Sequence, residues 1–366
     1  MSRPESASAV SNSRLQLPGG AETLLLEDAY VHRQVVATID RLFTSWGYLP
    51  IQTPMLDFFD GYRQLLDDDD ARRVYRLVDR DGELLMLRGD ATLFMAKQIG
   101  VALGSMQLPL RVCYYDSILR HQEGGDLSHS EFYQVGAELV GVEGDEGDLE
   151  ALALLCRLLD ELRLPDAVVH LGSRALLDAF AANEAEATLL RQIVLGRDLH
   201  RLEGALPIAH ERAGRLFAYV GEAVTFVDDL QSLAEGQPEA AVTELRRLAG
   251  IVSTLRSIGV ADRIRVDLSE IGSRSYHTGI AFSAYLAGLG SAVAAGGRYD
   301  RLLAAFGEGA PAAGFSLLLR KVESAMEDRS RFRHASRRER VAGGDFVDRY
   351  RRAERLRSDG SVAVLQ

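Results

Sequence analysis

The chain has 366 residues, 47% of them apolar, and carries a net charge of −11. This length and apolar content exclude wholesale disorder and predict more than one domain, or one domain with a large insertion. The acidic balance disfavours a general nucleic-acid binder, which needs a basic surface, and the only two cysteines rule out a disulfide framework and a Cys/His metal site.

Residues 1–20 are polar and Ser-rich and end in Pro-Gly-Gly, which predicts a flexible arm. The arm lacks the apolar core of a signal peptide. No apolar run in the chain approaches the roughly 18 residues that a membrane-spanning helix needs. We therefore expect a soluble, cytoplasmic protein without a membrane partner.

Apolar residues that recur at helical spacing from Leu26 to Phe43 predict a helix that stops at Gly47. The next segment, GYLPIQTPML, has β-branched residues, and Pro54, which cannot donate to a sheet, predicts an edge strand or a strand that ends there. Residues 67–70 are four consecutive aspartates. Since these cannot all converge on one ion, we expect a solvated loop rather than a metal site.

A β-hairpin is predicted next, because VYRLVD and ELLMLR flank an Asp-Gly turn. Asp90 then takes the N-cap position of a helix, DATLFMAKQIG. Two longer strands, RVCYYDSIL and EFYQVGAELVG, flank a loop with a Gly-Gly pair. A helix over 149–163 and a short strand, VVHLG, follow them.

Ala, Leu, Glu and Arg dominate residues 173–260, which predicts a helical insertion. Strand patterns return in RIRVDLS, YHTGIAFSAYLAG, SAVAAGGRYD and AAGFSLLL. Because the strands follow hairpin loops rather than regular strand–helix alternation, we expect an α+β fold with a largely antiparallel sheet. The core would comprise residues 21–172 and 261–326, and residues 327–366 would form a linker with a short helix and a last strand.

Common catalytic motifs, such as a phosphate loop or a nucleophile elbow, are absent from the sequence. The motifs that are present resemble, in order, those of the class II aminoacyl-tRNA synthetases, and of histidyl-tRNA synthetase in particular. GYLPIQTPML is similar to the first signature, LRHQEGGDLSHSEFYQVGAELVG to the second, and SAVAAGGRYDRLLAAFG with AAGFSLLLRKV to the third. LRGD resembles a segment that helps to hold the amino acid in that enzyme. The resemblance covers residues 20–326 and implies an antiparallel sheet flanked by helices.

An amino-acid pocket is predicted around Gln134 and Glu138. Side chains four apart on a strand point the same way, so both can face one cavity. Carboxylate and amide oxygens suit the ammonium group of an amino acid. The alternative is that both side chains lie on a solvent-exposed face. By the resemblance, Asp90, Thr92 and Arg120 belong to the same pocket.

Other residues have competing interpretations. Tyr276 and His277 could contact a ligand imidazole, or His277 could be structural. His121 and His129 flank the Gly-Gly loop and could sense pH or contact phosphates, but they fit exposed loop residues better. Residues 296–300 could form a ligand loop, or a strand-to-helix turn with Asp300 in the first turn of the helix, which is the better fit for Asp300. The arginine-rich residues 329–340 fit a solvated linker better than a nucleic-acid site.

Departures from the synthetase pattern indicate that adenylation is lost. Gln122 and Glu123 replace the glutamate and arginine expected there. In EIGSRSYHT, Glu270 occupies the position of a catalytic arginine, and its carboxylate would repel a phosphate unless a local shift brings Arg274 into that place. Lys321 replaces an ATP-clamping arginine and lacks the planar fork.

The anticodon-binding domain of the synthetase is also missing, because the roughly forty residues after 326 are too few for a domain core. A synthetase-like body without adenylation chemistry and without the RNA module resembles the regulatory subunits of ATP phosphoribosyltransferase. This resemblance implies a non-catalytic subunit without a cofactor. Such a subunit acts with a short catalytic subunit in the first step of histidine biosynthesis and mediates feedback by histidine.

The resemblance further implies a homodimer within a larger hetero-oligomer, with no transfer RNA as partner. Two alternatives remain open. One is an active histidine-adenylating enzyme, and the other is an amino-acid sensor for a different partner.

Overall fold

The computed structural model describes residue 17 and residues 20–121, 130–202, 210–333 and 338–366. The predicted flexible arm lies almost wholly outside these residues, as do Gln122, Glu123 and His129. The chain divides into two compact units, Met1–Glu22 with Arg41–Ala325, and Thr23–Asp40 with Met326–Gln366. The division into a discontinuous core, a helical insertion and a tail stays a prediction.

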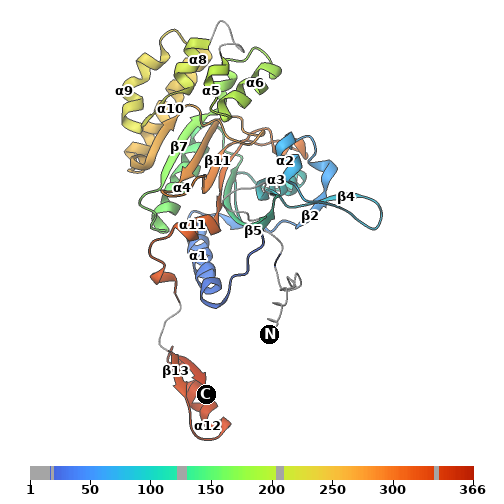
Figure 1. The fold of residues 1–366 in the computed structure, drawn as a ribbon, viewed down its shortest axis with the longest axis vertical. Coiled ribbons are helices and arrows are strands. Elements are labelled where there is room, and N and C mark those ends of the chain that lie inside the picture. Colours follow the sequence, from blue (N-terminus) through green and yellow to red (C-terminus); the bar gives the residue numbers. More distant parts are fainter. Residues whose placement is uncertain (1–16, 18–19, 122–129, 203–209, 334–337) are drawn as a thin grey trace, which may run out of the picture. The chain divides into compact units, whose positions relative to one another are not determined.

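A nine-stranded sheet runs through the first unit (Figure 1). Neighbouring strands are antiparallel except in the pairs β1–β5 and β7–β9, so the predicted α+β fold with a largely antiparallel sheet is confirmed. The proline-containing strand β1 lies at one edge, as Pro54 suggests for its segment. In sheet order the strands are β1 (Leu49–Pro50), β5 (Leu110–Leu119), β6 (Glu131–Val140), β12 (Ala312–Leu318), β11 (Ala294–Arg298), β10 (Ile280–Tyr285), β7 (Val168–Ser173), β9 (Ile264–Asp267) and β8 (Val220–Glu222).

Strand β6 lies inside this sheet, between β5 and β12. Helix α4 (Gly144–Glu161) packs against β6, β11 and β12 and begins before the predicted start at residue 149. Its apolar residues at helical spacing are buried, among them Leu152, Leu155 and Leu159. The strand therefore has hydrogen-bonded neighbours on both sides and a helix against the sheet.

Residues 173–260 are mainly helical, as their composition predicts, and Figure 1 shows these helices grouped together at the top of the view. A short strand, β8, lies among them and pairs with β9 in the main sheet, which the sequence does not predict. The helices are α5 (Arg174–Asp178), α6 (Glu184–Leu195), α8 (His210–Phe217), α9 (Ala223–Ala234) and α10 (Glu239–Ser257).

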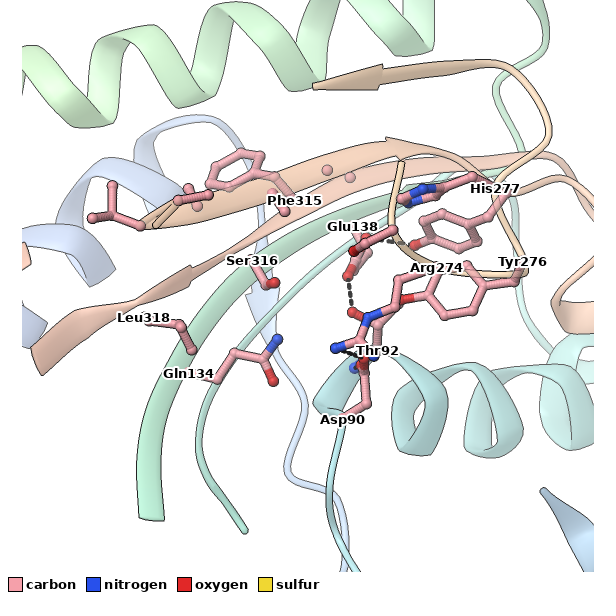
Figure 2. Close-up of a pocket in the computed structure, with 18 of the residues that line it drawn as sticks. Asp90, Thr92, Gln134, Glu138, Arg274, Tyr276, His277, Phe315, Ser316 and Leu318 are labelled. Carbon is pink, nitrogen blue, oxygen red and sulfur yellow. Dashed lines mark hydrogen bonds and ion pairs between the residues drawn. The ribbon is translucent and has the colours of Figure 1, made fainter. Parts of the chain in front are cut away.

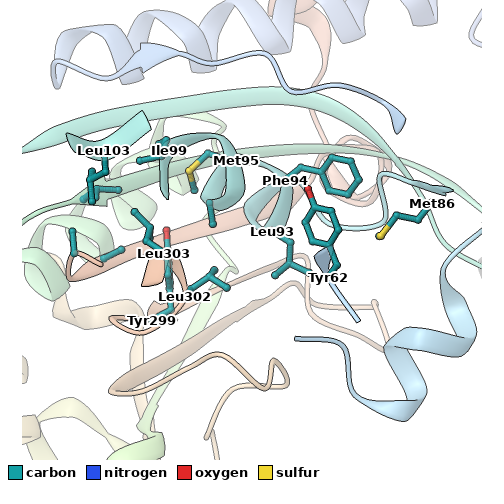
Figure 3. Packing of buried hydrophobic residues seen from close by; sticks show 14 of the residues in the cluster. Tyr62, Met86, Leu93, Phe94, Met95, Ile99, Leu103, Tyr299, Leu302 and Leu303 are labelled. Atoms are coloured by element: carbon teal, nitrogen blue, oxygen red, sulfur yellow. The ribbon is translucent and has the colours of Figure 1, made fainter. Parts of the chain in front are cut away.

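A smaller sheet of three strands holds the predicted hairpin. Its order is β2 (Leu56–Phe58), β4 (Leu84–Leu87) and β3 (Arg76–Val78), and the antiparallel β3–β4 pair confirms that hairpin. Helix α3 (Ala91–Ala102) packs in a core in which the Tyr62 and Phe94 rings stack with centroids 4.9 Å apart (Figure 3). Gly100 permits a close approach, because an added Cβ would lie 2.7 Å from the carbonyl oxygen of Leu303. This core fixes α3, and with it the position of Asp90.

The acidic residues 67–70 begin a helix, α2 (Asp68–Arg73), so the predicted solvated loop is wrong here. Asp67 caps the helix, and its Oδ1 accepts a hydrogen bond from the backbone N–H of Asp70 at 2.9 Å. The carboxylate of Asp70 in turn lies 2.6 and 2.8 Å from Nη1 of Arg274. Aspartates are favourable in the first turn because of the helix dipole. Within the described residues, no group of His, Cys, Asp and Glu is arranged to hold a metal ion.

The second unit contains a β-α-β segment. Strands β13 (Arg338–Val341) and β14 (Val362–Leu365) are parallel, and helix α12 (Phe346–Ser358) connects them. Val341, Ala353 and Ala363 form its small buried core. The predicted helix and last strand are present, but the predicted linker also contains β13, which parallel pairing with β14 stabilises.

The remaining helices are α1 (Leu26–Ser45) and α11 (Leu319–Ala325). In the described part of the chain, no helix combines the length and the apolar character needed to cross a membrane.

Candidate functional site

The seven predicted site residues all line one cavity of about 160 Å³ in the first unit (Figure 2). A cavity of about 150 Å³ can hold a benzene ring, so this volume suits a small ligand with a ring. The side chains come from β6, from the start of α3 and from the segment before β10, and strands β11 and β12 form a wall. The predicted residues in this lining are Asp90, Thr92, Arg120, Gln134, Glu138, Tyr276 and His277.

Gln134 and Glu138 lie on the same face of β6 and are 3% and 1% exposed. This burial excludes the alternative of a solvent-exposed face. Gly314 of β12 pairs with Glu138, and a Cβ at Gly314 would lie 1.8 Å from Glu138 Oε2. The absence of a side chain at Gly314 therefore makes room for the Glu138 carboxylate.

Three hydroxyl groups surround the Glu138 carboxylate. Thr92 Oγ1 donates to Oε1 at 2.9 Å, the Tyr114 hydroxyl donates to Oε1 at 3.3 Å, and the Tyr299 hydroxyl donates to Oε2. Burial raises the pKa of Glu138 to about 8, although these donors favour the charged form. Glu138 is therefore largely protonated near neutral pH, and a cationic ligand group would favour its ionised form.

Asp90 caps helix α3 and joins it to two arginines, as the sequence predicts for the cap. Its Oδ1 accepts from the backbone N–H of Thr92 at 2.9 Å, and its Oδ2 lies 3.2 Å from Nη2 of both Arg120 and Arg274. The carbonyl oxygen of Gly89 also accepts a hydrogen bond from Nε of Arg120. Burial, and then the neighbouring Arg274, lower the pKa of Arg120 to about 10, so it keeps its charge at neutral pH.

Arg274 lines the cavity with its guanidinium between Asp90 and Asp70. Burial disfavours its charge, but Asp90 and Asp70 raise the pKa of Arg274 above the ordinary value. The cavity thus presents two arginines as well as the carboxyl groups of Asp90 and Glu138. Groups of both signs suit a zwitterionic ligand, because arginine binds carboxylates and carboxylates bind ammonium groups.

The amide oxygen of Gln134 already accepts a hydrogen bond within the protein, whereas its amide nitrogen is available to a ligand. Its Oε1 accepts a hydrogen bond from the backbone N–H of Ala91 at 3.1 Å. The predicted contact between this oxygen and a ligand ammonium therefore falls on an atom that already has a donor. The amide nitrogen is the end best placed to serve a ligand, as a donor to a carboxylate or carbonyl oxygen.

Tyr276 and His277 form one wall of the cavity. The Tyr276 ring meets Tyr299 edge to face, with centroids 5.9 Å apart. Burial, and then Arg274, lower the pKa of His277 to about 3, so its imidazole is neutral. Its Nδ1 has no hydrogen-bond partner within the described residues and faces Gly272, where an added Cβ would lie 1.9 Å away. The absence of a side chain at Gly272 therefore makes room for the imidazole ring.

Glu270 does not line the cavity, and the predicted repulsion of a phosphate by its carboxylate stays a prediction. The side chain is buried, and Oε1 accepts from the backbone N–H of Gly272 at 3.3 Å. Arg274 faces the cavity instead, which is the local shift that the sequence leaves open. Lys321 is also absent from the lining, and its Nζ donates to Ser291 Oγ at 2.8 Å.

Two further candidates lie away from the cavity. His121 is exposed, and Asp300 Oδ1 accepts from the backbone N–H of Ala312 at 3.1 Å, so it holds a turn. The exposure of His121 agrees with its interpretation as a loop residue. Asp300 lies in a turn between β11 and the 3-10 helix Leu303–Ala305, so its predicted place in the first turn of a helix is wrong.

Four residues of the site were not assigned to it from the sequence. Arg274, which entered only as a possible local shift, and Tyr299 line the cavity, whereas Tyr114 donates to Glu138 and Asp70 holds Arg274. Tyr114 could have been found, because the predicted hairpin pairs it with Gly136, between Gln134 and Glu138 on the same face. The other three come from turns and helix ends, where no alternation marks the direction of a side chain.

The mostly antiparallel sheet, with a cavity built on β6, the start of α3 and the β11–β12 wall, defines a protein of the class II aminoacyl-tRNA synthetase type. The sequence matches the histidyl-tRNA synthetase family over residues 20–322. It is 32% identical over 366 residues to the ATP phosphoribosyltransferase regulatory subunit of Moorella thermoacetica, covering 97% of this chain and 93% of the relative. The chain belongs to the histidyl-tRNA synthetase-like family of ATP phosphoribosyltransferase regulatory subunits.

Other relatives agree with this family. The ATP phosphoribosyltransferase regulatory subunit of Symbiobacterium thermophilum is 30% identical over 323 residues, which cover 86% of this chain and 81% of that protein. A solved structure from Bacillus halodurans, described as an ATP phosphoribosyltransferase regulatory subunit/histidyl-tRNA synthetase, has a TM-score of 0.84 at 25% identity over 96% of this chain and 92% of that one. The histidyl-tRNA synthetase of Nostoc sp. PCC 7120 has a TM-score of 0.78 at 19% identity, over 96% of this chain and 86% of that one, and shares the fold. The predicted family and fold class are confirmed.

Proposed function

We propose that this chain binds histidine in the cavity and thereby controls a separate, short catalytic subunit of ATP phosphoribosyltransferase. As a member of the family, it is a regulatory subunit and not the catalyst of the reaction. The observation that carries the histidine proposal is the presence of two arginines, both paired with Asp90, and of the buried Glu138 carboxyl around one cavity of about 160 Å³. Feedback requires that histidine bind one state of the assembly more tightly than the other.

The geometry supports an orientation for the bound amino acid. The ammonium group would lie near Glu138, whose ionised form it favours, and the carboxylate would lie near Arg120 or the amide nitrogen of Gln134. The imidazole would then extend along the wall of Tyr276 and His277. A ligand ring against these aromatic side chains gains apolar contact.

The decisive experiment mixes the purified chain with the short catalytic subunit and measures the formation of phosphoribosyl-ATP. We expect no activity from this chain alone, a higher rate after mixing, and inhibition when histidine is added. The Asp90→Asn variant should retain activation and lose most of the inhibition, because Asp90 positions both arginines of the cavity. An unchanged rate on mixing would reject the regulatory role, whereas unchanged inhibition in Asp90→Asn would reject this cavity as the histidine site.

An active histidine-adenylating enzyme is the second candidate, because Arg120 and Arg274 both keep positive charge in the cavity. Histidine-dependent exchange of pyrophosphate into ATP tests it directly, and no exchange is expected for a regulatory subunit. A sensor for another partner would bind histidine without raising the rate of the catalytic subunit. The cytoplasmic location, the homodimer within a hetero-oligomer, the lack of a cofactor and the absence of transfer RNA as a partner stay predictions.

A further inference from the structure

A second cavity, of about 350 Å³, lies where the helices of residues 173–260 meet the segment before β10. Tyr276 and His277 line both this cavity and the proposed histidine cavity, so these two side chains separate the two spaces. The other lining residues come from α5, from the start of α6, from Ser275 and Thr278, and from Arg301. None of the polar residues of α5 and α6 takes part in the site described above.

Arg174 is the buried cation of this cavity and is only 7% exposed. Its Nε donates to Asp178 Oδ1 at 3.0 Å, and its backbone N–H donates to the carbonyl oxygen of Gly279 at 2.8 Å. Its Nη1 is buried and has no hydrogen-bond partner among the described residues. Nη1 has almost no accessible surface, so an acceptor in the cavity reaches it only if the guanidinium turns toward that space. A buried charged donor without a partner costs roughly 1–3 kcal/mol or more, which favours such a turn toward a bound acceptor.

Helix α6 begins at the same cavity, with Asn183 and Glu184 in the lining. Asn183 Oδ1 accepts from the backbone N–H of Glu186 at 3.0 Å, which satisfies the third N–H of the helix. The first two N–H groups of a helix have no partner within it, and they favour an anion. Together with the buried Arg174, this helix start provides donors from two sides.

The charges around the cavity favour an anion in its interior. Arg301 lines it from an exposed position, and Asp178 and Glu184 are exposed as well, where solvent screens their negative charge. Of these four charged side chains, only that of Arg174 is buried. Asp178 contacts its guanidinium at Nε. The buried charge of the cavity is that of Arg174, which its ion pair with Asp178 partly offsets, and the exposed Arg301 adds a second positive charge.

We propose that this second cavity binds a phosphate group, free or as a small phosphate ester, between Arg174, Arg301 and the first turn of α6. A phosphate offers several acceptor oxygens and up to two charges, so it can accept from donors on different sides at once. A carboxylate such as acetate has one plane of acceptors and leaves most of about 350 Å³ unfilled. The site is separate from the histidine cavity, and its existence does not depend on histidine binding.

The test is titration calorimetry on the full chain with inorganic phosphate and with ribose 5-phosphate, at constant ionic strength, with acetate as the comparison anion. We expect both phosphates to bind at one site per chain and acetate at least tenfold more weakly. Tighter binding of the ester would identify an esterified phosphate as the favoured source. Tighter binding of inorganic phosphate would identify the free ion. Equal binding of acetate, or no binding of either phosphate, overturns the proposal.

Three variants assign the binding to this cavity. Arg174→Gln should weaken phosphate binding at least tenfold, while the exposed Arg246→Gln on α10 changes the charge equally and should leave binding unchanged. Ala182→Glu adds a carboxylate at the exposed rim without removing a buried group, so it remains informative if Arg174→Gln folds poorly. Asp90→Asn should bind phosphate as the wild type does, which separates this site from the histidine cavity. Wild-type phosphate affinity in both Arg174→Gln and Ala182→Glu would place the anion elsewhere.

Discussion

Thr92 Oγ1 donates a hydrogen bond to Glu138 Oε1 across 2.9 Å, and this bond ties the start of helix α3 to the middle of strand β6. Both side chains are buried, so the bond lies in a space that excludes bulk water. The bond thereby fixes the start of the helix relative to the strand where both line the cavity. A change in either residue should alter ligand binding before it alters the fold.

Replacement of Thr92 by Val tests this bond. The variant keeps the shape of the side chain and removes the hydroxyl, which leaves the buried carboxyl of Glu138 with one donor fewer. We expect histidine affinity to fall about tenfold, ~1.4 kcal/mol. The matched control is Thr254→Val on α10, because Thr254 Oγ1 bonds only its own helix at an exposed position. Equal affinities in the two variants, measured by calorimetry, would show that this bond does not shape the site.

Glu138 should make the stability of the protein depend on pH in a defined direction. Burial raises the pKa of Glu138 to about 8 in the folded chain, and an unfolded glutamate has a pKa near 4.5. Between these values the folded state holds a proton that the unfolded state has released, so the free energy of unfolding falls as pH rises through this range. The Glu138→Gln variant lacks this carboxyl group and therefore lacks its contribution to the pH dependence of stability.

The measurement compares the unfolding temperature at about pH 5 and about pH 8.5. The wild type should lose more stability across this interval than Glu138→Gln does, and the exposed Glu235→Gln should behave like the wild type. If Glu138→Gln retains the full pH dependence, the buried carboxyl is not the group responsible.

A methyl group at position 314 should displace the Glu138 carboxylate. In Gly314→Ala the new Cβ would meet Glu138 Oε2 at 1.8 Å and the carbonyl oxygen of Ala137 at 2.4 Å. We expect a loss of roughly 1–3 kcal/mol in the free energy of unfolding, together with loss of histidine binding. Gly250→Ala on α10 is the control, since a Cβ there meets nothing within 4 Å and should stabilise the helix by up to about 1 kcal/mol. Denaturant unfolding checks both, and a Gly314→Ala protein as stable as Gly250→Ala would contradict the expectation.

Substitutions of Asp70 and Asp69, both within the acidic residues 67–70, should have different effects on histidine affinity, because only Asp70 pairs with Arg274. Asp70→Asn weakens the contact with Arg274 Nη1 and frees the guanidinium to move, so histidine affinity should fall roughly tenfold. Asp69→Asn, one residue away, affects only an exposed pair with Arg73, which is worth at most about 1 kcal/mol, and should leave affinity unchanged. A similar response of the two variants in a binding titration would mean that the run acts through its overall charge.

Periodicity and alternation explain which parts of this protein could be predicted from its sequence. Once β6 is predicted as a strand, the shared face of Gln134 and Glu138 follows from their four-residue spacing. Asp90 could be placed because a cap residue before an apolar run has few other roles. The family resemblance added Asp90, Thr92 and Arg120 to the pocket, which no period in the sequence brings together.

The features that could not be predicted depend on contacts between distant residues. The sequence predicts that Asp70 is solvated, and only its contact with Arg274, which follows the helical segment in the chain, links it to a residue of the cavity. Position-by-position comparison placed Glu270 in the site, but the turn after Asp267 directs its side chain to Gly272 instead. Strand β13 gave no signal of its own because its four residues, RERV, carry three charges and depend on β14.

The order of strands in the sheet has a consequence for protein synthesis. Strand β6 pairs with β5 as soon as both have left the ribosome, but its other neighbour, β12, follows only after the whole helical segment of residues 173–260 has been made. At about 5–20 residues per second, this edge of β6 stays open for on the order of ten seconds. A nascent chain stalled in that interval would carry the Glu138 half of the cavity on an unpaired strand edge, where another chain can add to it. Fragments that end before residue 312 should therefore aggregate during translation, and chaperones that shield open strand edges should associate with the nascent chain in this interval.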